Sequence, residues 1–294
     1  MTTMKSAGRK NSSRPFKEFY SEWFDSLKNA LLPFLRRAIS SVSTSHIHVP
    51  VQRHPLGAVL ASTSDFSSGC LSGPLLMLHN HFHAYFQALD LAARHDASQL
   101  LFPHWRNSLE KPFLWFGDLH PCLFTYLLRS FLANEEDDDD GNASKPNSHS
   151  VGDNNLPLPF SIAWKNPQRS LTKRIEQIER RLRHKVLAIA ARFRDAQSGF
   201  LEKVAADWAL QRGGSEETGM GMNSALAAQS EELTSIFIDA NRLRVSALEE
   251  IMGVLDVYQG ALYLETLARF LVGFRDSGLL HAFQRSKTPL SPLI

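Results

Sequence analysis

The stretch from Leu171 to Leu210 decides the fold, and it reads "LTKRIEQIERRLRHKVLAIAARFRDAQSGFLEKVAADWAL". Its apolar residues recur every three or four positions, which places them along one line of an α-helix. These residues are Leu171, Ile175, Ile178, Leu182, Val186, Ile189, Phe193, Phe200, Val204 and Trp208. Gly199 is the single weak point, at about 1 kcal/mol relative to alanine. About 40 residues predict a rod of roughly 60 Å, which ends in "RGGSEETGMGMN" with Gly213 as the expected C-cap.

Helical spacing also marks the segments around this rod. One helix is expected from Phe16 to Leu35, and Pro33 is expected to kink or end it near its last turn. A second is expected to start at Pro74, with one buried face made of Leu78, Phe82, Tyr85, Phe86 and Leu89. Helices at about 230–254 and 257–276 follow the rod, and the Ser/Thr/Gly-rich residues 40–73 are expected to form a loop.

Strand signals are weak throughout, so the sequence predicts an all-α fold, a single helical-bundle domain with one very long helix. The expected divisions are a disordered basic tail at 1–14, the domain at 15–278 and a flexible tail at 279–294. The acidic, Gly/Pro/Asn-rich segment at about 135–160 is expected to be a disordered insertion.

Composition excludes several classes of protein. The 294 residues are 43% hydrophobic and 21% charged with a net charge of +2, as expected for a soluble globular protein without a strong overall field. Two cysteines form neither a disulfide framework nor a zinc site. No signal-peptide pattern and no uninterrupted apolar window of membrane-spanning length occur, so we expect no membrane span.

Enzyme signatures are absent. The sequence holds no GxSxG, P-loop, HExxH or CxxC motif, and "GMGMNS" lacks the third glycine and the preceding strand of a phosphate-binding loop, so a linker is expected there. The run Asp137–Asp140 lacks the ligand spacing of a calcium loop. We therefore expect a protein that is not an enzyme and that needs no cofactor.

The segment "HNHFHAYF" contains closely spaced histidines. His79 and His83 are neighbours on a helix, whereas His81 lies on another side. Two imidazoles could ligate a metal or haem if a third ligand came from elsewhere. The alternative, which we favour, is that they are histidines at the boundary between the core and the surface.

One flank of the long helix is basic. It carries Arg174, Arg181, Lys185, Arg192 and Lys203, and no acidic residue shares it between 172 and 206. This flank is expected to meet anionic lipid head groups, an acidic partner or the acidic insertion. The alternative is that acids on neighbouring helices neutralise it. Nucleic acid fits less well, because no basic region leads into a zipper and no basic–aromatic interleave occurs.

The stretch "WRNSLEKPFLWFGDLHPCLFTYLLRSFL", residues 105–132, is apolar but broken in its middle. It predicts a helix, a turn and a second helix. Gly117 permits a tight reversal, Asp118 is expected to cap the second helix and Pro121 suits its first position.

The aromatic residues of this stretch are expected to hold the reversal in the core, at about 1.5–3 kcal/mol each. They are Trp105, Phe113, Trp115 and Phe124. Glu110 and Lys111 are expected to point outward. The alternative to this structural role is a groove for a partner, with exposed aromatic residues as anchors.

The order of these segments resembles the delay-of-germination (seed dormancy control) domain of plants, which also forms the C-terminal part of TGA-type bZIP transcription factors. The resemblance rests on "FKEFYSEWFDSLKNALLPFLRR", on Trp105, Glu110 and "FLWFGDLHP", on "LTKRIEQIERRLRHKVLAIAARF" and on "ANRLRVSALEEIMGVLDVYQGALYLETLARFLVGFR". It covers roughly residues 15–278. Asp118 and Leu119 replace the second glycine and the aromatic residue of the family's "LWIGGWRP"-like turn.

Within this family the chain is most similar to members that consist of the domain alone and act in pollen aperture formation. The resemblance implies a non-enzymatic adaptor in the cytoplasm, peripheral at plasma-membrane patches that stay free of exine. Its expected partners are other aperture-factor proteins or anionic lipids, without direct binding to nucleic acid; the oligomeric state stays open. The alternative is a nuclear transcription cofactor or a haem-binding module, like the dormancy and TGA-type relatives.

Overall fold

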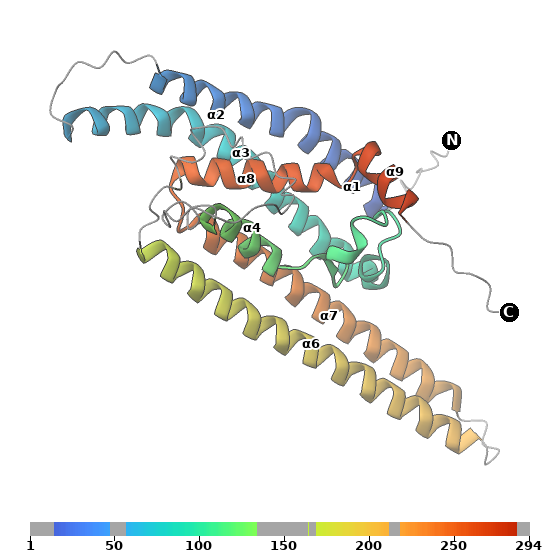
Figure 1. Ribbon diagram of the computed structural model, residues 1–294. Coiled ribbons are helices and arrows are strands. Elements are labelled where there is room, and N and C mark those ends of the chain that lie inside the picture. The colour runs from blue at the N-terminus through green and yellow to red at the C-terminus, as the bar shows by residue number, and fades with distance from the viewer. Residues whose placement is uncertain (1–14, 48–56, 134–163, 165–168, 212–217, 287–294) are drawn as a thin grey trace, which may run out of the picture.

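The computed structural model describes residues 15–47, 57–133, 164, 169–211 and 218–286. Figure 1 shows a helical bundle, which confirms the predicted all-α class with one small two-stranded hairpin added. The elements are α1 (Phe16–Ser26), η1 (Leu27–Leu31), α2 (Leu32–Ile47), α3 (Gly57–Leu101), η2 (Lys111–Phe113), β1 (Leu114–Trp115), β2 (Asp118–Leu119), α4 (Cys122–Ala133), α6 (Arg169–Gln211), α7 (Thr218–Met252), α8 (Val257–Gly273) and α9 (Ser277–Arg285). The expected tail at 1–14 and the insertion at 135–160 lie outside the described residues.

The first helix passes through Pro33, so the prediction that it ends near the proline was wrong, whereas a distortion of the helix is present just before it. The chain stays helical from α1 through η1 into α2. η1 is a π-helical turn that lies just before the proline. A proline ring clashes with the carbonyl group four residues earlier, and the wider π-helical turn opens the backbone there. The aromatic face of α1, with Tyr20, Trp23 and Phe24, is buried as its spacing predicted.

The predicted loop at 40–73 was also wrong, because α2 continues to Ile47 and α3 begins at Gly57. Pro74 therefore lies inside α3 and does not start it. The helical path breaks at Asp96, with φ −161° and ψ 91°. The Asp96 carboxylate accepts hydrogen bonds from the backbone N–H groups of Ser98 and Gln99, at 3.0 and 3.3 Å, and so caps the last turns. All five residues of the predicted apolar face of α3 are buried.

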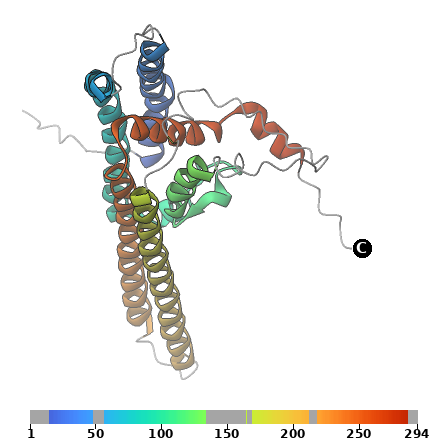
Figure 2. The same ribbon diagram turned by 60° about the vertical axis from the view of Figure 1, so that its left-hand side comes forward.

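The long rod is confirmed as α6, which pairs with the antiparallel helix α7 (Figure 1). α7 begins at Thr218 and not near 230, so "GMGMNS" is helical and is not a linker. Gly213 lies outside the described residues. The first half of the α6 stripe is buried, but Trp208 at its far end is 62% exposed. Figures 1 and 2 show why: the far ends of α6 and α7 extend beyond the other helices.

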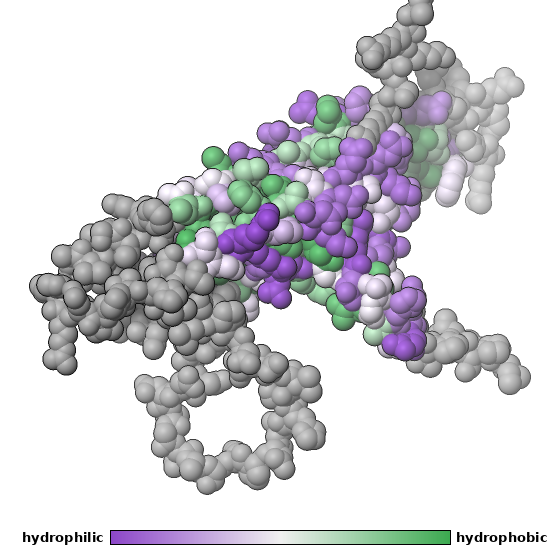
Figure 3. All heavy atoms as spheres, turned by 90° about the horizontal axis from the view of Figure 1, so that it is seen from above, coloured by the Kyte–Doolittle hydropathy of each residue, from purple (hydrophilic) through white to green (hydrophobic). Residues whose placement is uncertain are grey.

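α8 crosses the bundle and contacts α2 and α3. Asp256 caps it, and Gln259 completes a reciprocal capping box. Asp276 caps α9, which points away from the bundle in Figure 2. Residues 279–285, expected in a flexible tail, are therefore helical. On the face seen in Figure 3, hydrophobic and hydrophilic side chains are interspersed, so this face alone identifies no docking surface.

Candidate functional site

The turn predicted around Gly117 is a two-residue hairpin between β1 and β2. Leu114 pairs with Leu119, and Trp115 pairs with Asp118. The connecting residues Phe116 and Gly117 have positive φ values of 45° and 76°, as in the hairpin turns whose twist matches that of the strands. Gly117 thus reverses the chain as predicted, although the elements it joins are short strands, not helices.

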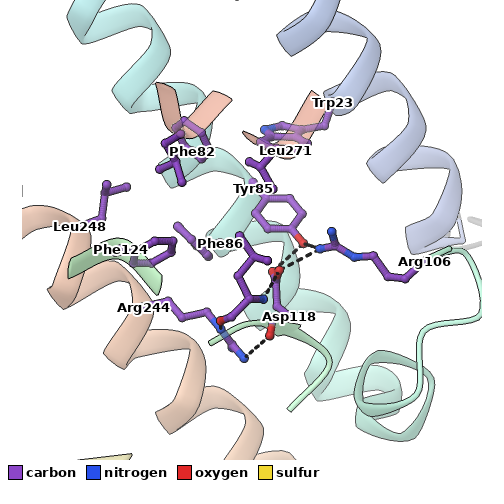
Figure 4. Close-up of a pocket in the computed structure, with 12 residues that line it drawn as sticks. Trp23, Phe82, Tyr85, Phe86, Arg106, Asp118, Phe124, Arg244, Leu248 and Leu271 are labelled. Atoms are coloured by element: carbon purple, nitrogen blue, oxygen red, sulfur yellow. Dashed lines mark hydrogen bonds and ion pairs between the residues drawn. The ribbon is translucent and has the colours of Figure 1, made fainter. Parts of the chain in front are cut away.

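The carboxylate of Asp118 does not cap a helix, contrary to prediction. It is 3% exposed and accepts a 2.8 Å hydrogen bond from the Arg106 guanidinium, which is 4% exposed. The Tyr85 hydroxyl donates to its other oxygen at 2.6 Å. Arg106 also donates to the hydroxyls of Tyr85 and Tyr20, at 2.7 and 2.9 Å. Figure 4 shows Tyr85, Arg106 and Asp118 converging from α3, the loop after it and the hairpin.

Burial governs the protonation of the two tyrosines in this cluster. It raises the pKa of Tyr20 to about 12 and the pKa of Tyr85 well above its ordinary value. Both hydroxyls therefore keep their protons at neutral pH. We infer that the cluster is a buried ion pair supported by hydrogen bonds to two neutral hydroxyls, although the buried Nε of Arg106 has no partner among the described residues.

Arg244 on α7 holds the hairpin from the other side. It is fully buried and donates from Nε to the carbonyl oxygen of Leu119 at 2.8 Å. Its Nη2 donates to the carbonyls of Trp115, Phe116 and Asp118. These strand and turn carbonyls have few partners in so short a hairpin, and one guanidinium satisfies several of them.

Glu110 is 1% exposed and does not point outward, contrary to prediction, whereas Lys111 is exposed as predicted. The Glu110 carboxylate accepts a hydrogen bond from the backbone N–H of Asn107 at 3.0 Å and lies 3.8 Å from the Arg275 guanidinium. The Asn107 side chain accepts from the backbone N–H groups of Leu109 and Glu110 and donates to the Phe274 carbonyl. The loop is thereby fixed to the end of α8.

The remaining predicted turn residues lie around the same cluster. Trp105 and Trp115 are half-buried and pack against the core, and Pro121 is buried directly before α4. The position of Pro121 agrees with the predicted first helical position within one residue. Phe124 is buried and Phe113 half-buried, so the aromatic residues do hold this reversal in the bundle.

The cavity beside this cluster is too small for an organic ligand. It measures about 20 Å³ and is bounded by Arg106, Asp118, Arg244 and apolar side chains (Figure 4). That volume is about the space of one water molecule. The cluster therefore holds α3, α7 and the hairpin together, and the cavity beside it has no room for a substrate.

The histidine pair lies elsewhere on α3. The rings of His79 and His83 are 4.5 Å apart, and His83 lies 3.7 Å from the Glu249 carboxylate of α7. Burial and the neighbouring His83 lower the pKa of His79, although Glu249 raises it. Within the described ranges no group of three or more His, Cys, Asp or Glu side chains is arranged to hold a metal ion. The third histidine, His81, stacks on Trp23 and is bonded to its carbonyl oxygen.

The basic flank of α6 is divided by its contacts. Arg181 pairs with Glu250 of α7. Arg192 pairs with Glu232 at 2.7 Å and with Asp239 at 2.6 Å. For these two residues the neutralising acids on a neighbouring helix are present. Arg174, Lys185 and Lys203 are exposed, and in the described part of the chain they lie in no ion pair.

Four residues of the site were not predicted from the sequence, namely Arg106, Arg244, Tyr85 and Asn107. Only Arg106 could have been identified from the sequence. It lies with Asp118 in a stretch dominated by apolar residues, where charged groups of opposite sign are expected to pair when buried.

Comparison with known proteins places this site in a family. Residues 66–130, which include the ion pair and the hairpin, match the family model described as seed dormancy control. Over 291 residues the chain is 38% identical to the protein INAPERTURATE POLLEN1 of Arabidopsis thaliana, covering 96% of this chain and 97% of the relative. The chain belongs to the INAPERTURATE POLLEN1 family. The INAPERTURATE POLLEN 1 homolog of Oryza sativa subsp. japonica is 32% identical over 281 residues, or 95% of this chain and 93% of the relative.

Membership in the INAPERTURATE POLLEN1 family supports a role in pollen aperture formation in a plant. The names of the relatives and of the matching model refer to pollen and to seed dormancy, and not to an enzyme. Among the helices that the structure describes, none has the length and apolar content needed to cross a bilayer.

One prediction concerns pH. Burial raises the pKa of Glu110, although Arg106, the Asn107 N–H and Arg275 lower it. The folded protein therefore binds more protons than the unfolded chain from about pH 4.5 up to the raised pKa, and this group's contribution to stability declines as pH rises through that window. Glu110→Gln is expected to remove this decline, as measured by urea unfolding between pH 4.5 and 7. The exposed Glu176→Gln serves as the control, and an unchanged slope in Glu110→Gln would contradict the prediction.

Proposed function

We propose that this chain is a non-catalytic adaptor in pollen aperture formation, acting at the cytoplasmic face of the plasma membrane by binding anionic lipids and other aperture-factor proteins. The observation that carries the proposal is the far end of the α6–α7 pair. It extends beyond the bundle (Figures 1 and 2) and carries Lys203 of the basic flank, while the other exposed cations of that flank, Lys185 and Arg174, precede it along α6. Because it extends beyond the other helices, this end of the helical pair can contact a membrane or another protein.

The contacts of the hairpin turn at Phe116 and Gly117 support the absence of catalysis in this proposal. Arg106 and Asp118 are buried and paired with each other, Arg244 is buried against backbone carbonyls, and the adjoining cavity of about 20 Å³ admits no substrate. A general base or nucleophile must reach the reacting group within hydrogen-bonding distance. Arg106, Asp118 and Arg244 have no such access, so they serve the fold and leave binding to the exterior.

The lipid contact is assigned to the cations of α6 outside the ion pairs with α7. Arg174, Lys185 and Lys203 are exposed along one flank. Each cation near an anionic membrane surface contributes about 1 kcal/mol, and three give about 3 kcal/mol. Arg181 and Arg192 contribute less to such a contact, because their guanidinium groups already face carboxylates of α7.

Replacing Arg174, Lys185 and Lys203 together by glutamate is therefore expected to weaken binding to vesicles that contain phosphatidylserine by roughly 100-fold or more. Co-sedimentation with these vesicles measures the effect. The control replaces Lys28, Arg37 and Arg94, which are exposed on other helices, and changes the net charge equally. Equal loss in both variants would indicate nonspecific attraction, and unchanged binding in the first would leave protein tethering as the attachment.

A second candidate is a nuclear cofactor or ligand-binding module, as the resemblance to dormancy and TGA-type relatives implies; residues 66–130 match the model described as seed dormancy control. A fluorescent fusion in developing pollen separates the two functions. Discrete patches at the plasma membrane support the adaptor, whereas signal confined to the nucleus would reject it in favour of the cofactor.

A further inference from the structure

α6 has a second apolar face, on a side turned away from α7. Leu187, Leu201 and Trp208 are 69%, 64% and 62% exposed. Their positions differ by multiples of seven residues, so their side chains follow one line along the helix. In Figures 1 and 2, α6 forms the outer edge of the helical pair, and no described helix covers this side. Large apolar side chains aligned in this way are typical of helix-pairing surfaces.

Small residues form the neighbouring line on the same face. Ala191, Ser198 and Ala205 are also spaced by seven. Short side chains permit two helix axes to approach closely, because the distance between packed helices is set by the residues at the contact. The face therefore combines a shallow groove with apolar residues along its edge, and a second helix fits it better than a flat surface does.

The charged residues on this face indicate that the helix bound there is α6 of a second copy. Arg194 and Glu202 lie four residues before and four residues after Ser198, and both are exposed. Within the described part of the chain Arg194 lies in no ion pair, and Glu202 contacts only Ser198 Oγ, at 3.3 Å. An antiparallel second copy with its twofold axis at Ser198 brings Arg194 of each copy opposite Glu202 of the other.

The same axis matches two further pairs of residues on the face. Ala191 meets Ala205 of the second copy, and Leu187 lies next to Trp208 of the second copy, within one residue of register. At these three pairs of positions the face is complementary to itself, as an isologous contact requires. Lipid head groups would match Arg194 but would repel Glu202.

We propose that two copies of this chain associate through this face of α6, antiparallel and with the twofold axis at Ser198. The proposal does not depend on the proposed function, because it concerns a different side of α6 from the lipid-facing cations. It predicts a reversible dimer, since one pair of helices buries less area than obligate dimers do.

Sedimentation velocity of the full chain over a range of concentrations tests the association. The unmodified chain is expected to shift from monomer to dimer as concentration rises, and Leu201→Glu with Trp208→Glu is expected to remain monomeric. Leu91→Glu is the matched control, because Leu91 is 63% exposed on α3 and is expected to leave dimerisation unchanged. A chain that stays monomeric throughout, or equal loss in the control, would overturn the proposal.

Charge exchange tests the register. Arg194→Glu or Glu202→Arg alone places like charges opposite each other at two symmetric positions and is expected to weaken the dimer roughly tenfold. Mixing the two single variants, or combining both changes in one chain, restores opposite charges and is expected to restore the affinity. Circular dichroism checks that every variant is folded. If the mixture dimerises as weakly as each single variant, the antiparallel contact is wrong.

Discussion

Replacing Asp118 by alanine is expected to lower the free energy of unfolding by about 3–5 kcal/mol, because it leaves the buried guanidinium of Arg106 without its counter-charge. Both side chains are almost completely buried, and their charged atoms are 2.8 Å apart. The Tyr85 hydroxyl would also lose the carboxylate to which it donates. Urea-induced unfolding followed by circular dichroism measures this effect.

The control for Asp118→Ala is Asp239→Ala, which removes an acid from a partly exposed pair with Arg192. Its expected cost is below about 1 kcal/mol, because water screens the pair and replaces the lost contacts. Similar losses in the two variants would contradict the importance of burial. A double-mutant cycle with Arg106→Ala adds a sharper test: the double variant should cost less than the sum of the two single variants.

The groups around the ion pair come from distant parts of the chain, and this explains why the cluster was not predicted from the sequence. Arg106 and Asp118 lie in one segment, and their opposite charges in apolar surroundings indicate a pair. Tyr85 comes from α3, and Arg244 comes from α7, more than a hundred positions along the chain. No local periodicity reports such contacts, so the cap predicted for Asp118 reflected only its nearest neighbours.

The helices and strands were likewise predicted only where their own sequence carries a local pattern. α6 follows from its own apolar spacing, because a helix with one buried stripe carries the pattern in its sequence. The first turns of α3 carry no such stripe, and their Ser, Thr and Gly content favoured a loop. Strands of two residues are too short to show alternation. Glu110 was expected to be exposed because no local pattern in the sequence indicates its contact with Arg275. The Arg275 side chain that lies beside it comes from the far end of the chain.

Replacing Gly117 by alanine is expected to cost more than about 3 kcal/mol of unfolding free energy. The φ value of +76° is unfavourable for a residue with a Cβ atom, at about 1–2 kcal/mol. The larger effect is steric, because a Cβ atom at this position would lie 1.7 Å from the Leu100 carbonyl oxygen. That oxygen belongs to the backbone at the end of α3, so the hairpin must shift away from the helix and loosen the contacts of Asp118 and Arg244.

Gly199→Ala provides the matched control, since the substitution is identical and no atom lies within 4 Å of the added Cβ. In the middle of the exposed part of α6 it is expected to stabilise the protein by about 0.5–1 kcal/mol, because alanine favours the helix. Thermal and urea unfolding of both variants should therefore move in opposite directions. If Gly117→Ala had the same unfolding free energy as the unmodified chain, the turn would tolerate a side chain. The close packing of the hairpin against α3 would then not be what holds the ion pair in place.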